Sequence, residues 1–227
     1  MQLKYSLDVR YFLDCCSSSN FIDYSEAFQA MKEFTLNRNE KTIDEFWVLE
    51  HKPVFTLGKT ADESQILCKN NIDLVRSDRG GQITYHSPGQ LMIYNFIDLK
   101  RKNISVRYLV ESLEKGIIKT LSNYDVEAYG DRKAPGVYVE NKKIASLGLR
   151  ISRGCSYHGL CFNFDFDEKP FTYINPCGIP GLKIIQLRDL VNDMPNKRLF
   201  AEELIGNISN KLGYLNVSHI NDDWKIN

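Results

Sequence analysis

Residues 78–90 read DRGGQITYHSPGQ, and residues 91–97 continue directly as LMIYNFI. The first segment is rich in glycine and also holds Arg79 and His86, so it combines a fixed charge with a titratable ring. Glycine lets a backbone adopt positive φ and lets another molecule approach closely. The second segment has the length and apolar composition of a buried strand. We therefore expect an irregular loop that leads into a buried strand, and an ordinary turn between two strands is the simpler alternative.

On both sides of this segment, apolar periodicity indicates further helices and strands. Asp23 followed by Glu26 has the spacing of a capping box, and apolar side chains then recur at helical intervals. Because strands come in runs with helices between the runs, we expect an α+β (α/β) fold with a mixed β-sheet flanked by helices, in a single domain over residues 1–227. Residues 1–20 give only a weak signal. Helices are predicted over 24–37, 106–122 and 196–212, strands over 45–50, 54–58, 73–76, 91–97, 126–129, 137–139, 144–151 and 155–164, and loops over 59–71 and 165–182.

The composition excludes several classes of function. Hydrophobic residues make up 43% of the chain, which allows a sizeable core. Lys plus Arg equals Asp plus Glu at 29 each, so the formal net charge is zero and no global field favours nucleic acid or an anionic membrane. No apolar run approaches the roughly 18 residues of a membrane span, and the first residues lack the features of a signal or transit peptide. We therefore expect a cytoplasmic protein that binds neither nucleic acid nor membrane.

The six cysteines do not form a metal or redox motif. None belongs to a Cys-x-x-Cys pair, so a zinc knuckle or a redox-active dithiol is not expected. In a chain of this size without a signal peptide, reduced thiols are the better interpretation. A lone cysteine is most often a buried apolar residue. This interpretation is kept for Cys15, Cys16, Cys68, Cys155 and Cys161.

Four motifs could carry chemistry. The first reads RGGxxTxHxPGQ over residues 79–90, and the second reads APGVYV over 134–139 followed by KKIASLG over 142–148. The third reads HGLCFN over 158–163, and the fourth reads INPCGI over 174–179. A minor element, HxPVFTxG over 51–58, precedes them. These motifs lie far apart in the chain yet must share one substrate, so we expect residues 79–90 and 174–179 to meet at one cleft.

Together the motifs resemble the octanoyltransferase family, the lipoyl(octanoyl) transferases of lipoate biosynthesis, over about residues 47–190. The resemblance implies a catalytic domain like that of biotin and lipoate–protein ligases. It implies an acyltransferase that moves an octanoyl group from octanoyl-acyl carrier protein to a lysine of lipoyl domains through a cysteine acyl-thioester. The acceptors would be the lipoyl domains of 2-oxoacid dehydrogenase E2 subunits and the glycine cleavage H protein. No cofactor and no metal are implied.

The resemblance also implies the site residues. Cys177 matches the catalytic cysteine and Lys143 matches the catalytic lysine. Lys142 is a close competitor, but a shift of one residue on a strand points a side chain to the opposite face. The substrate-contacting positions implied are Arg79, Gly80, Gly81, Gln82, Ile83, Thr84, Tyr85, His86, Ser146, Leu147, Gly148, Gly159, Leu160 and Cys161.

The chemistry of these residue types agrees with the implied roles. Thioester transfer needs a good nucleophile, and a thiolate is one that a nearby cation favours. Lys143 could favour the thiolate, take the thiol proton and later serve the incoming amine. Cys177 lies between proline and glycine, in a loop whose backbone N–H groups could face an oxyanion. The simpler alternative for Lys143 is a charge at the end of a hairpin. For His86 and His158 the simpler alternative is a structural histidine whose ring nitrogens are hydrogen-bonded within the fold.

Three other functions are consistent with parts of the sequence. An ATP-dependent lipoate–protein ligase would need a nucleotide-binding loop and no cysteine nucleophile, but no P-loop motif is present. A non-catalytic acyl-carrier or lipoyl-domain binding module would leave no covalent adduct on Cys177. A cysteine hydrolase would need a histidine base on the thiol, and no His/Asn pattern supports one.

Overall fold

The computed structural model describes residues 3–13, 21–68, 70–132 and 134–224. Its helices are α1 (Tyr24–Asn37), α2 (Leu99–Lys102), α3 (Val106–Ser122) and α4 (Lys197–Lys211). Its strands are β1 (Ser6–Tyr11), β2 (Asp44–Leu49), β3 (Val54–Leu57), β4 (Asp73–Arg76), β5 (Ile83–His86), β6 (Gln90–Phe96), β7 (Tyr129–Gly130), β8 (Gly136–Val139), β9 (Lys142–Ser152), β10 (Cys155–Asn163) and β11 (Asn216–Asn221). Short 3-10 turns occupy Leu3–Tyr5, Glu63–Gln65, Lys169–Tyr173, Pro176–Gly178 and Leu187–Asp189.

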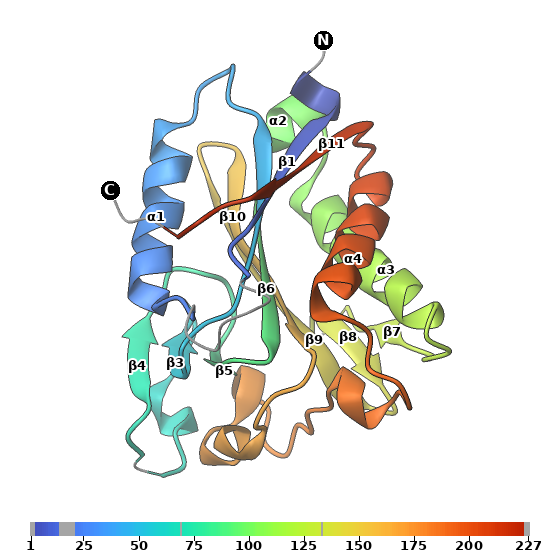
Figure 1. Cartoon of the computed structure of the whole chain (residues 1–227). Helices are drawn as coiled ribbons and strands as arrows, with labels where there is room; N and C mark the ends of the chain where they lie inside the picture. Colours follow the sequence, from blue (N-terminus) through green and yellow to red (C-terminus); the bar gives the residue numbers. More distant parts are fainter. Residues whose placement is uncertain (1–2, 14–20, 69, 133, 225–227) are drawn as a thin grey trace.

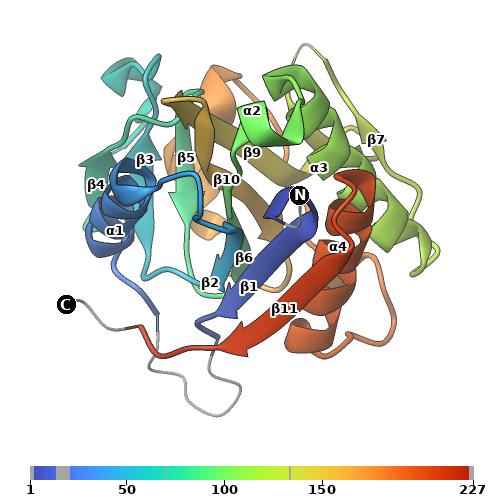
Figure 2. The same ribbon diagram turned by 90° about the horizontal axis from the view of Figure 1, so that it is seen from above.

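The strands of this described part form two sheets (Figure 1). The large sheet has the order β11-β1-β2-β6-β10-β9-β8-β7, and the small sheet has the order β4-β3-β5. Strand β1 pairs in parallel with both β11 and β2, and β3 pairs in parallel with β4, whereas the other pairs are antiparallel. Helix α1 lies on one face of the large sheet, and α3 and α4 lie on the other (Figure 2). The predicted mixed sheet with flanking helices is confirmed.

Side-chain alternation along the central strands gives the large sheet two cores. In β2, Phe46 and Val48 belong to the core that contains side chains of α3 and α4. Trp47 and Leu49 point to the opposite face and belong to the core that contains side chains of α1. A strand that is buried on both faces reads as a continuous apolar run, which explains why the central strands were detectable in the sequence. No helix in the described ranges is long and apolar enough to cross a membrane.

The three long helices agree with their predicted ranges and begin at polar caps. The Asp23 side chain accepts a hydrogen bond from the N–H of Ser25 at 2.8 Å at the start of α1. The Ser105 hydroxyl oxygen accepts one from the N–H of Tyr108 at 3.1 Å at the start of α3, and Asn196 caps α4 in the same way. Each cap satisfies a backbone donor that has no partner within the helix.

Three predictions about strands need correction. The glycine-rich segment is not irregular throughout, because residues 83–86 form β5 and pair with β3. The strand predicted over 126–129 shrinks to β7, and Val126 instead packs into the core directly after α3. Strands β1 and β11 were not predicted. Strand β11 is the edge strand and is largely exposed, and β1 lies between β11 and β2. Both are short, and pairing with neighbours distant in sequence stabilises them.

A buried carboxylate joins β2 to other parts of the fold. The Asp44 side chain is fully buried, and its Oδ1 accepts hydrogen bonds from Arg38 at 2.6 Å and from Arg101 at 2.5 Å. The same oxygen accepts one from the N–H of Asp98 at 2.9 Å, and Oδ2 accepts one from the Tyr214 hydroxyl at 2.7 Å. Burial, with the charge of Asp44, raises the pKa of Tyr214 well above its usual value. Asp44 therefore holds the end of α1, the start of α2 and the segment before β11 together.

We expect Asp44→Ala to lower the free energy of unfolding by about 3–5 kcal/mol, because it leaves two guanidinium groups without their buried carboxylate. Urea denaturation followed by tryptophan fluorescence would measure the change. The control Glu63→Ala removes an ion pair with Arg76 whose side chains are 60% and 66% exposed. This control variant should lower the free energy of unfolding by no more than about 1 kcal/mol. Equal decreases in the two variants would contradict the role assigned to Asp44.

Candidate active site

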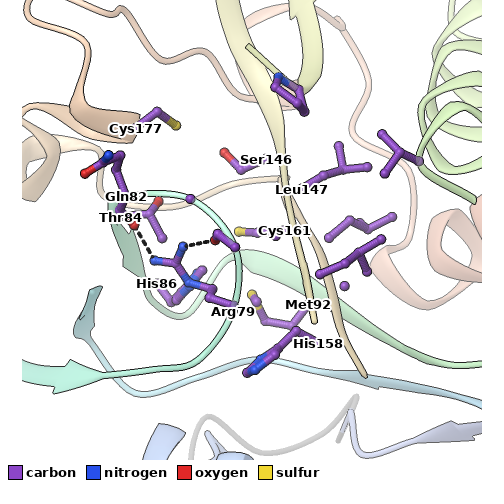
Figure 3. A pocket seen from close by; sticks show the side chains of 18 of the residues that line it. Arg79, Gln82, Thr84, His86, Met92, Ser146, Leu147, His158, Cys161 and Cys177 are labelled. Atoms are coloured by element: carbon purple, nitrogen blue, oxygen red, sulfur yellow. Dashed lines mark hydrogen bonds between the residues drawn. The ribbon is translucent and has the colours of Figure 1, made fainter. Parts of the chain in front are cut away.

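A cavity of about 550 Å³ lies where the glycine-rich segment, β9, β10 and the 3-10 turn at Pro176–Gly178 meet (Figure 3). Figure 3 shows Cys177 on one side of the cavity, Cys161 toward its middle, and Met92 and His158 on the side away from Cys177. Side chains of α1 and α3 complete the lining. The two motifs that were expected to share a cleft, around residues 79–90 and 174–179, both line this cavity.

Two glycines let the glycine-rich segment lie directly against β9. The N–H of Gly80 donates a hydrogen bond to the carbonyl oxygen of Leu149 at 2.9 Å. A Cβ at Gly80 would lie 3.2 Å from that same oxygen, and a Cβ at Gly148 would lie 3.2 Å from the carbonyl oxygen of Gly80. Side chains at either position would press the two backbones apart, so glycine is needed for this close approach.

Arg79 stabilises the glycine-rich segment through hydrogen bonds to backbone carbonyl oxygens. Its guanidinium group donates hydrogen bonds to the carbonyl oxygens of Thr56 at 2.7 Å, Gln82 at 2.8 Å and Gly80 at 3.0 Å. It also donates to the Thr56 hydroxyl oxygen at 2.8 Å. Burial lowers the pKa of Arg79, but a guanidinium group stays protonated in proteins. Arg79 therefore shapes the loop and also places a fixed positive charge in the cavity wall.

Lys143 and Cys177 are in contact inside the cavity. The Lys143 Nζ lies 3.3 Å from the Cys177 Sγ, although the two residues are 34 positions apart. The Lys143 side chain comes from β9 and the residue is only 2% exposed. Cys177 has φ 57° and ψ 15°, in the left-handed region. This conformation costs a non-glycine residue about 1–3 kcal/mol and is found most often at functional sites.

A β-bulge sets the direction of Lys143. Between β8 and β9, Val137 pairs with Ala145 but Tyr138 pairs with Lys143, so Ile144 is an extra residue on β9. A bulge bends its strand and can re-aim a side chain toward a site. The Lys143 Nζ lies 5.4 Å from the centre of the Tyr138 ring, which provides a cation–π contact in place of water.

The neighbouring Lys142 points elsewhere, as strand alternation predicted. Its side chain is 37% exposed and forms an ion pair with Glu140 at 3.7 Å. The two lysines of the motif thus have different environments, and only Lys143 contacts Cys177 among the ion pairs and hydrogen bonds of the described residues.

Two buried amides connect the lysine strand to the rest of the site. The Gln90 Nε2 donates a hydrogen bond to the Asn163 Oδ1 at 2.7 Å, and the Gln90 Oε1 accepts one from the N–H of Ser87 at 3.0 Å. The Asn163 Nδ2 donates to the carbonyl oxygens of Ile185 at 3.0 Å and Lys143 at 3.3 Å. This network joins the end of the glycine-rich segment, the backbone of Lys143 and the segment after the 3-10 turn. Sequence reasoning did not assign these amides a role.

Three buried histidines lie in or behind the cavity wall. The Nδ1 of His51 donates to a backbone carbonyl at 2.8 Å, and its Nε2 accepts a hydrogen bond from the Tyr94 hydroxyl at 2.5 Å. Burial lowers the pKa of His51 to about 4 and that of His86 well below the usual value. Burial also lowers the pKa of His158, although its Nε2 contacts Asp78 at 2.8 Å. The rings are therefore neutral near neutral pH, which agrees with a structural role.

The structure places nearly all of the predicted substrate-contacting residues at the cavity. Tyr85 is the exception, because its ring packs against Phe55 at 5.3 Å and Phe171 at 5.7 Å in a separate core. Successive side chains of a strand point to opposite faces, so a contiguous motif on β5 cannot direct every residue to the same place. The predicted residues that line the cavity, with Cys177 and Lys143, are Arg79, Gly80, Gly81, Gln82, Ile83, Thr84, His86, Ser146, Leu147, Gly148, Gly159, Leu160 and Cys161.

The cavity also has lining residues that the sequence analysis did not assign to the site. Met92 and Tyr94 alternate on β6, and Val106 and Val110 are one turn apart on α3. Their spacing indicated a buried face, but it could not tell a core from a cavity wall. The additional lining residues are Tyr24, Met92, Tyr94, Val106, Val110, Ala134, Pro135, Leu149, His158 and Ile179.

The remaining cysteines differ in their surroundings. Cys155 and Cys161 are buried as predicted, and burial raises the pKa of Cys161 to about 12. Cys68 is exposed, so the prediction of a buried residue is wrong for this position. Cys15 and Cys16 lie outside the described residues. Within the ranges that the structure describes, no group of three His, Cys, Asp or Glu side chains could hold a metal ion.

In sequence, the chain is similar to octanoyltransferases. The model of the lipoyl protein ligase A/B catalytic domain family matches residues 23–209. The octanoyltransferase of Aliivibrio fischeri is 48% identical over 207 residues, which cover 88% of this chain and 92% of that protein. The octanoyltransferase of Haemophilus influenzae strain PittEE is 50% identical over 194 residues, with 85% and 92% covered.

Solved structures share the fold at low sequence identity. Lipoate-protein ligase A bound with ATP has a TM-score of 0.72 at 14% identity, with 96% of this chain and 90% of that chain covered. The biotin protein ligase from Aquifex aeolicus in complex with biotin and ATP has a TM-score of 0.53 at 13% identity, with 91% and 68% covered. These likenesses concern the fold alone, and they confirm the predicted similarity to biotin and lipoate–protein ligases.

We expect the free energy of unfolding to decrease as the pH falls from about 6.5 to about 4, in part because of His51. The folded-state pKa of His51 is about 4, below the usual value of 6.5, so the unfolded chain binds the proton first. The stability contributed by the neutral ring is fully present above the unfolded-state value and is lost across this window.

Urea denaturation at several pH values between about 4 and about 7 would measure this slope. In His51→Gln the slope should be smaller than in the wild type. A slope that is the same in His51→Gln and the wild type would contradict the prediction.

Proposed function

Because this chain belongs to the lipoyl protein ligase A/B catalytic family and, within it, to the octanoyltransferases, we propose that it transfers an octanoyl group from octanoyl-acyl carrier protein to a lysine of lipoyl domains. The observation that carries this proposal is the 3.3 Å contact between the Lys143 Nζ and the Cys177 Sγ inside the cavity. A thiol beside an ammonium group, in a cavity with an apolar lining, suits covalent transfer of an acyl chain.

In the first half of the reaction, Cys177 is the nucleophile and Lys143 supplies a proton. The Cys177 thiolate attacks the carbonyl carbon of the octanoyl thioester, and a new S–C bond forms. The C–S bond to the carrier protein breaks, and the departing thiolate takes a proton from the Lys143 ammonium. The octanoyl group then remains on Cys177 as a thioester, and Lys143 is neutral.

In the second half, the neutral amine of the acceptor lysine attacks the carbonyl carbon of the acyl-enzyme. The N–C bond forms, the S–C bond to Cys177 breaks, and the proton of the amine passes to Lys143. The thiolate and the ammonium are thereby restored. The sum is a thioester and an amine converted to an amide and a thiol, so no external acid, base or energy source is needed.

The cavity lining suits an eight-carbon acyl chain. Leu147, Leu160 and Met92 contribute apolar surface. Cys161, which burial keeps as a neutral thiol, adds to this surface. Burial of methylene groups against such a lining stabilises binding by about 0.8 kcal/mol each. We place the acyl chain along these residues, with its carbonyl group at Cys177.

We assign the lipoyl domains of 2-oxoacid dehydrogenase E2 subunits and the glycine cleavage H protein as acceptors. The donor is an acyl carrier protein, since its thioester is already activated. An ATP-dependent lipoate–protein ligase is the alternative, because lipoate-protein ligase A, which shares the fold, was solved with ATP. The cysteine in contact with Lys143 favours the transferase over the ligase, which would need no thiol.

We expect the wild-type protein to gain the mass of one octanoyl group when it is incubated with octanoyl-acyl carrier protein in the absence of ATP. Cys177→Ala should lose both this adduct and transfer to a lipoyl domain, because the attacking atom is gone. Intact-mass spectrometry measures the adduct. Cys68→Ala, which removes an exposed thiol outside the cavity, should keep the adduct. Activity that requires ATP and free octanoate would assign the protein to the ligases instead.

We expect Lys143→Ala to slow octanoyl transfer by about 10² to 10⁴, the usual value of general acid–base assistance. Lys143→Arg keeps a positive charge but does not readily give up a proton, so it should restore the reactivity of Cys177 toward alkylation more than it restores turnover. Lys142→Ala is the matched control, because that side chain is partly exposed and pairs with Glu140. Normal turnover and normal alkylation of Lys143→Ala across the pH range would refute the role of Lys143.

A further inference from the structure

Glu114 on α3 is a carboxylate that lies behind the wall of the cavity at Lys143. Its Oε1 accepts a hydrogen bond from the N–H of Gly136, the first residue of β8, at 3.0 Å. A Cβ at Gly130 of β7 would lie 3.1 Å from its Oε2. The carboxylate is partly buried, and its hydrogen bond ties α3 to the start of β8.

Gly136 connects the Glu114 carboxylate to Lys143 and Cys177, the proposed catalytic pair. Its φ of +147° is one that residues with side chains rarely adopt. A Cβ at this position would overlap the Cε of Lys143 and lie 3.1 Å from its Nζ. The backbone of Gly136 thus touches the end of the lysine side chain, while its N–H binds Glu114. A continuous chain of contacts runs from α3 through Glu114 and Gly136 to Lys143 and Cys177.

The surrounding charges couple Glu114 to Lys143. Burial raises the pKa of Glu114, and the carboxylates of Glu111 and Asp131 act in the same direction. The N–H of Gly136 and the charge of Lys143 oppose this rise. Glu111, one turn earlier on the same helix, forms its own ion pairs with two largely exposed arginines.

We infer that Glu114 is a positioning residue for Lys143, an inference that rests on the proposed octanoyl transfer. The ionised carboxylate holds the backbone of Gly136 against the lysine and favours its ammonium form. The ammonium in turn favours the thiolate of Cys177. Glu114 thus acts on the nucleophile through the lysine without touching substrate. Tyr138 from β8 and Cys177 from the 3-10 turn also face Lys143.

Three variants separate the charge of Glu114 from its hydrogen bond and from the stability of the fold. Glu114→Gln keeps an oxygen that can accept from Gly136 but removes the charge. Glu114→Ala removes both. Glu111→Gln makes the same chemical change one turn away on α3 and is the matched control. The urea midpoint of each variant shows that it is folded before any rate is compared.

Two rates report on the catalytic pair. The first is alkylation of Cys177 by iodoacetamide, followed by mass spectrometry of the peptide that contains this residue, which needs no acyl substrate. The second is octanoyl transfer from the carrier protein. At about pH 8 we expect Glu114→Gln to slow both rates about tenfold with an unchanged KM, which is the lower end of the loss seen when residues that orient metal ligands are replaced. Glu114→Ala should slow them further.

The pH dependence distinguishes this role from a merely structural one. Because the pKa of Glu114 is raised, the wild-type carboxylate takes up a proton as the pH falls and then resembles glutamine. The ratio of wild-type to Glu114→Gln rates should therefore fall toward one as the pH is lowered from about 8 through the raised pKa of Glu114. A ratio that does not change with pH, or an equal effect of Glu111→Gln, would overturn the inference.

The two readouts also keep the inference apart from the proposed function. If the wild-type protein forms no octanoyl adduct, the proposed transfer fails, but the alkylation rates still show whether Glu114 acts on Cys177 through Lys143. If the adduct forms and the alkylation ratio is constant over pH, octanoyl transfer stands and the role of Glu114 is refuted.

Discussion

The contact between the Lys143 Nζ and the Cys177 Sγ is the interaction around which the site is built. An ammonium group that is withdrawn from water loses hydration free energy unless other groups replace the water. Here the sulfur atom and the Tyr138 ring lie beside it, and Gly136 leaves room because it has no side chain. The cysteine reaches the lysine only from a left-handed backbone conformation. A bulged hairpin, a glycine and a strained turn must therefore be held in one arrangement.

The surrounding fold holds that arrangement in place. Strained backbone persists only where its neighbours determine it strongly. The amide of Asn163 binds the backbone of Lys143 and of Ile185, so Lys143 and the segment that follows the strained turn are both tied to β10. Strand β10 is itself buried along its whole length between β6 and β9. The rigid large sheet thus holds the backbone of Lys143 in place through hydrogen bonds.

The charges in the cavity follow from burial. The histidines at its wall are neutral near neutral pH because burial lowers their pKa values. Arg79 cannot lose its proton in the same way, and its hydrogen bonds to three carbonyl oxygens keep it within the loop. Arg79 and Lys143 are therefore the cations at a lining that is otherwise neutral among the described residues. The lining thus combines apolar surface with two positive charges, and the Lys143 Nζ lies against the Cys177 Sγ.

By itself, the sequence determined the features whose signals are local. Capping side chains such as Asp23 and the continuous apolar runs of the central strands identified the long helices and most of the sheet, and short motifs selected Lys143 and Cys177. Only the tertiary structure decided that these two side chains meet, that Tyr85 points into a different core, and that Glu114 lies behind Gly136. Strands β1 and β11 were missed for the same reason. Each of these features depends on strand order and register, which bring together residues far apart in the chain, and no local spacing of residues encodes that proximity.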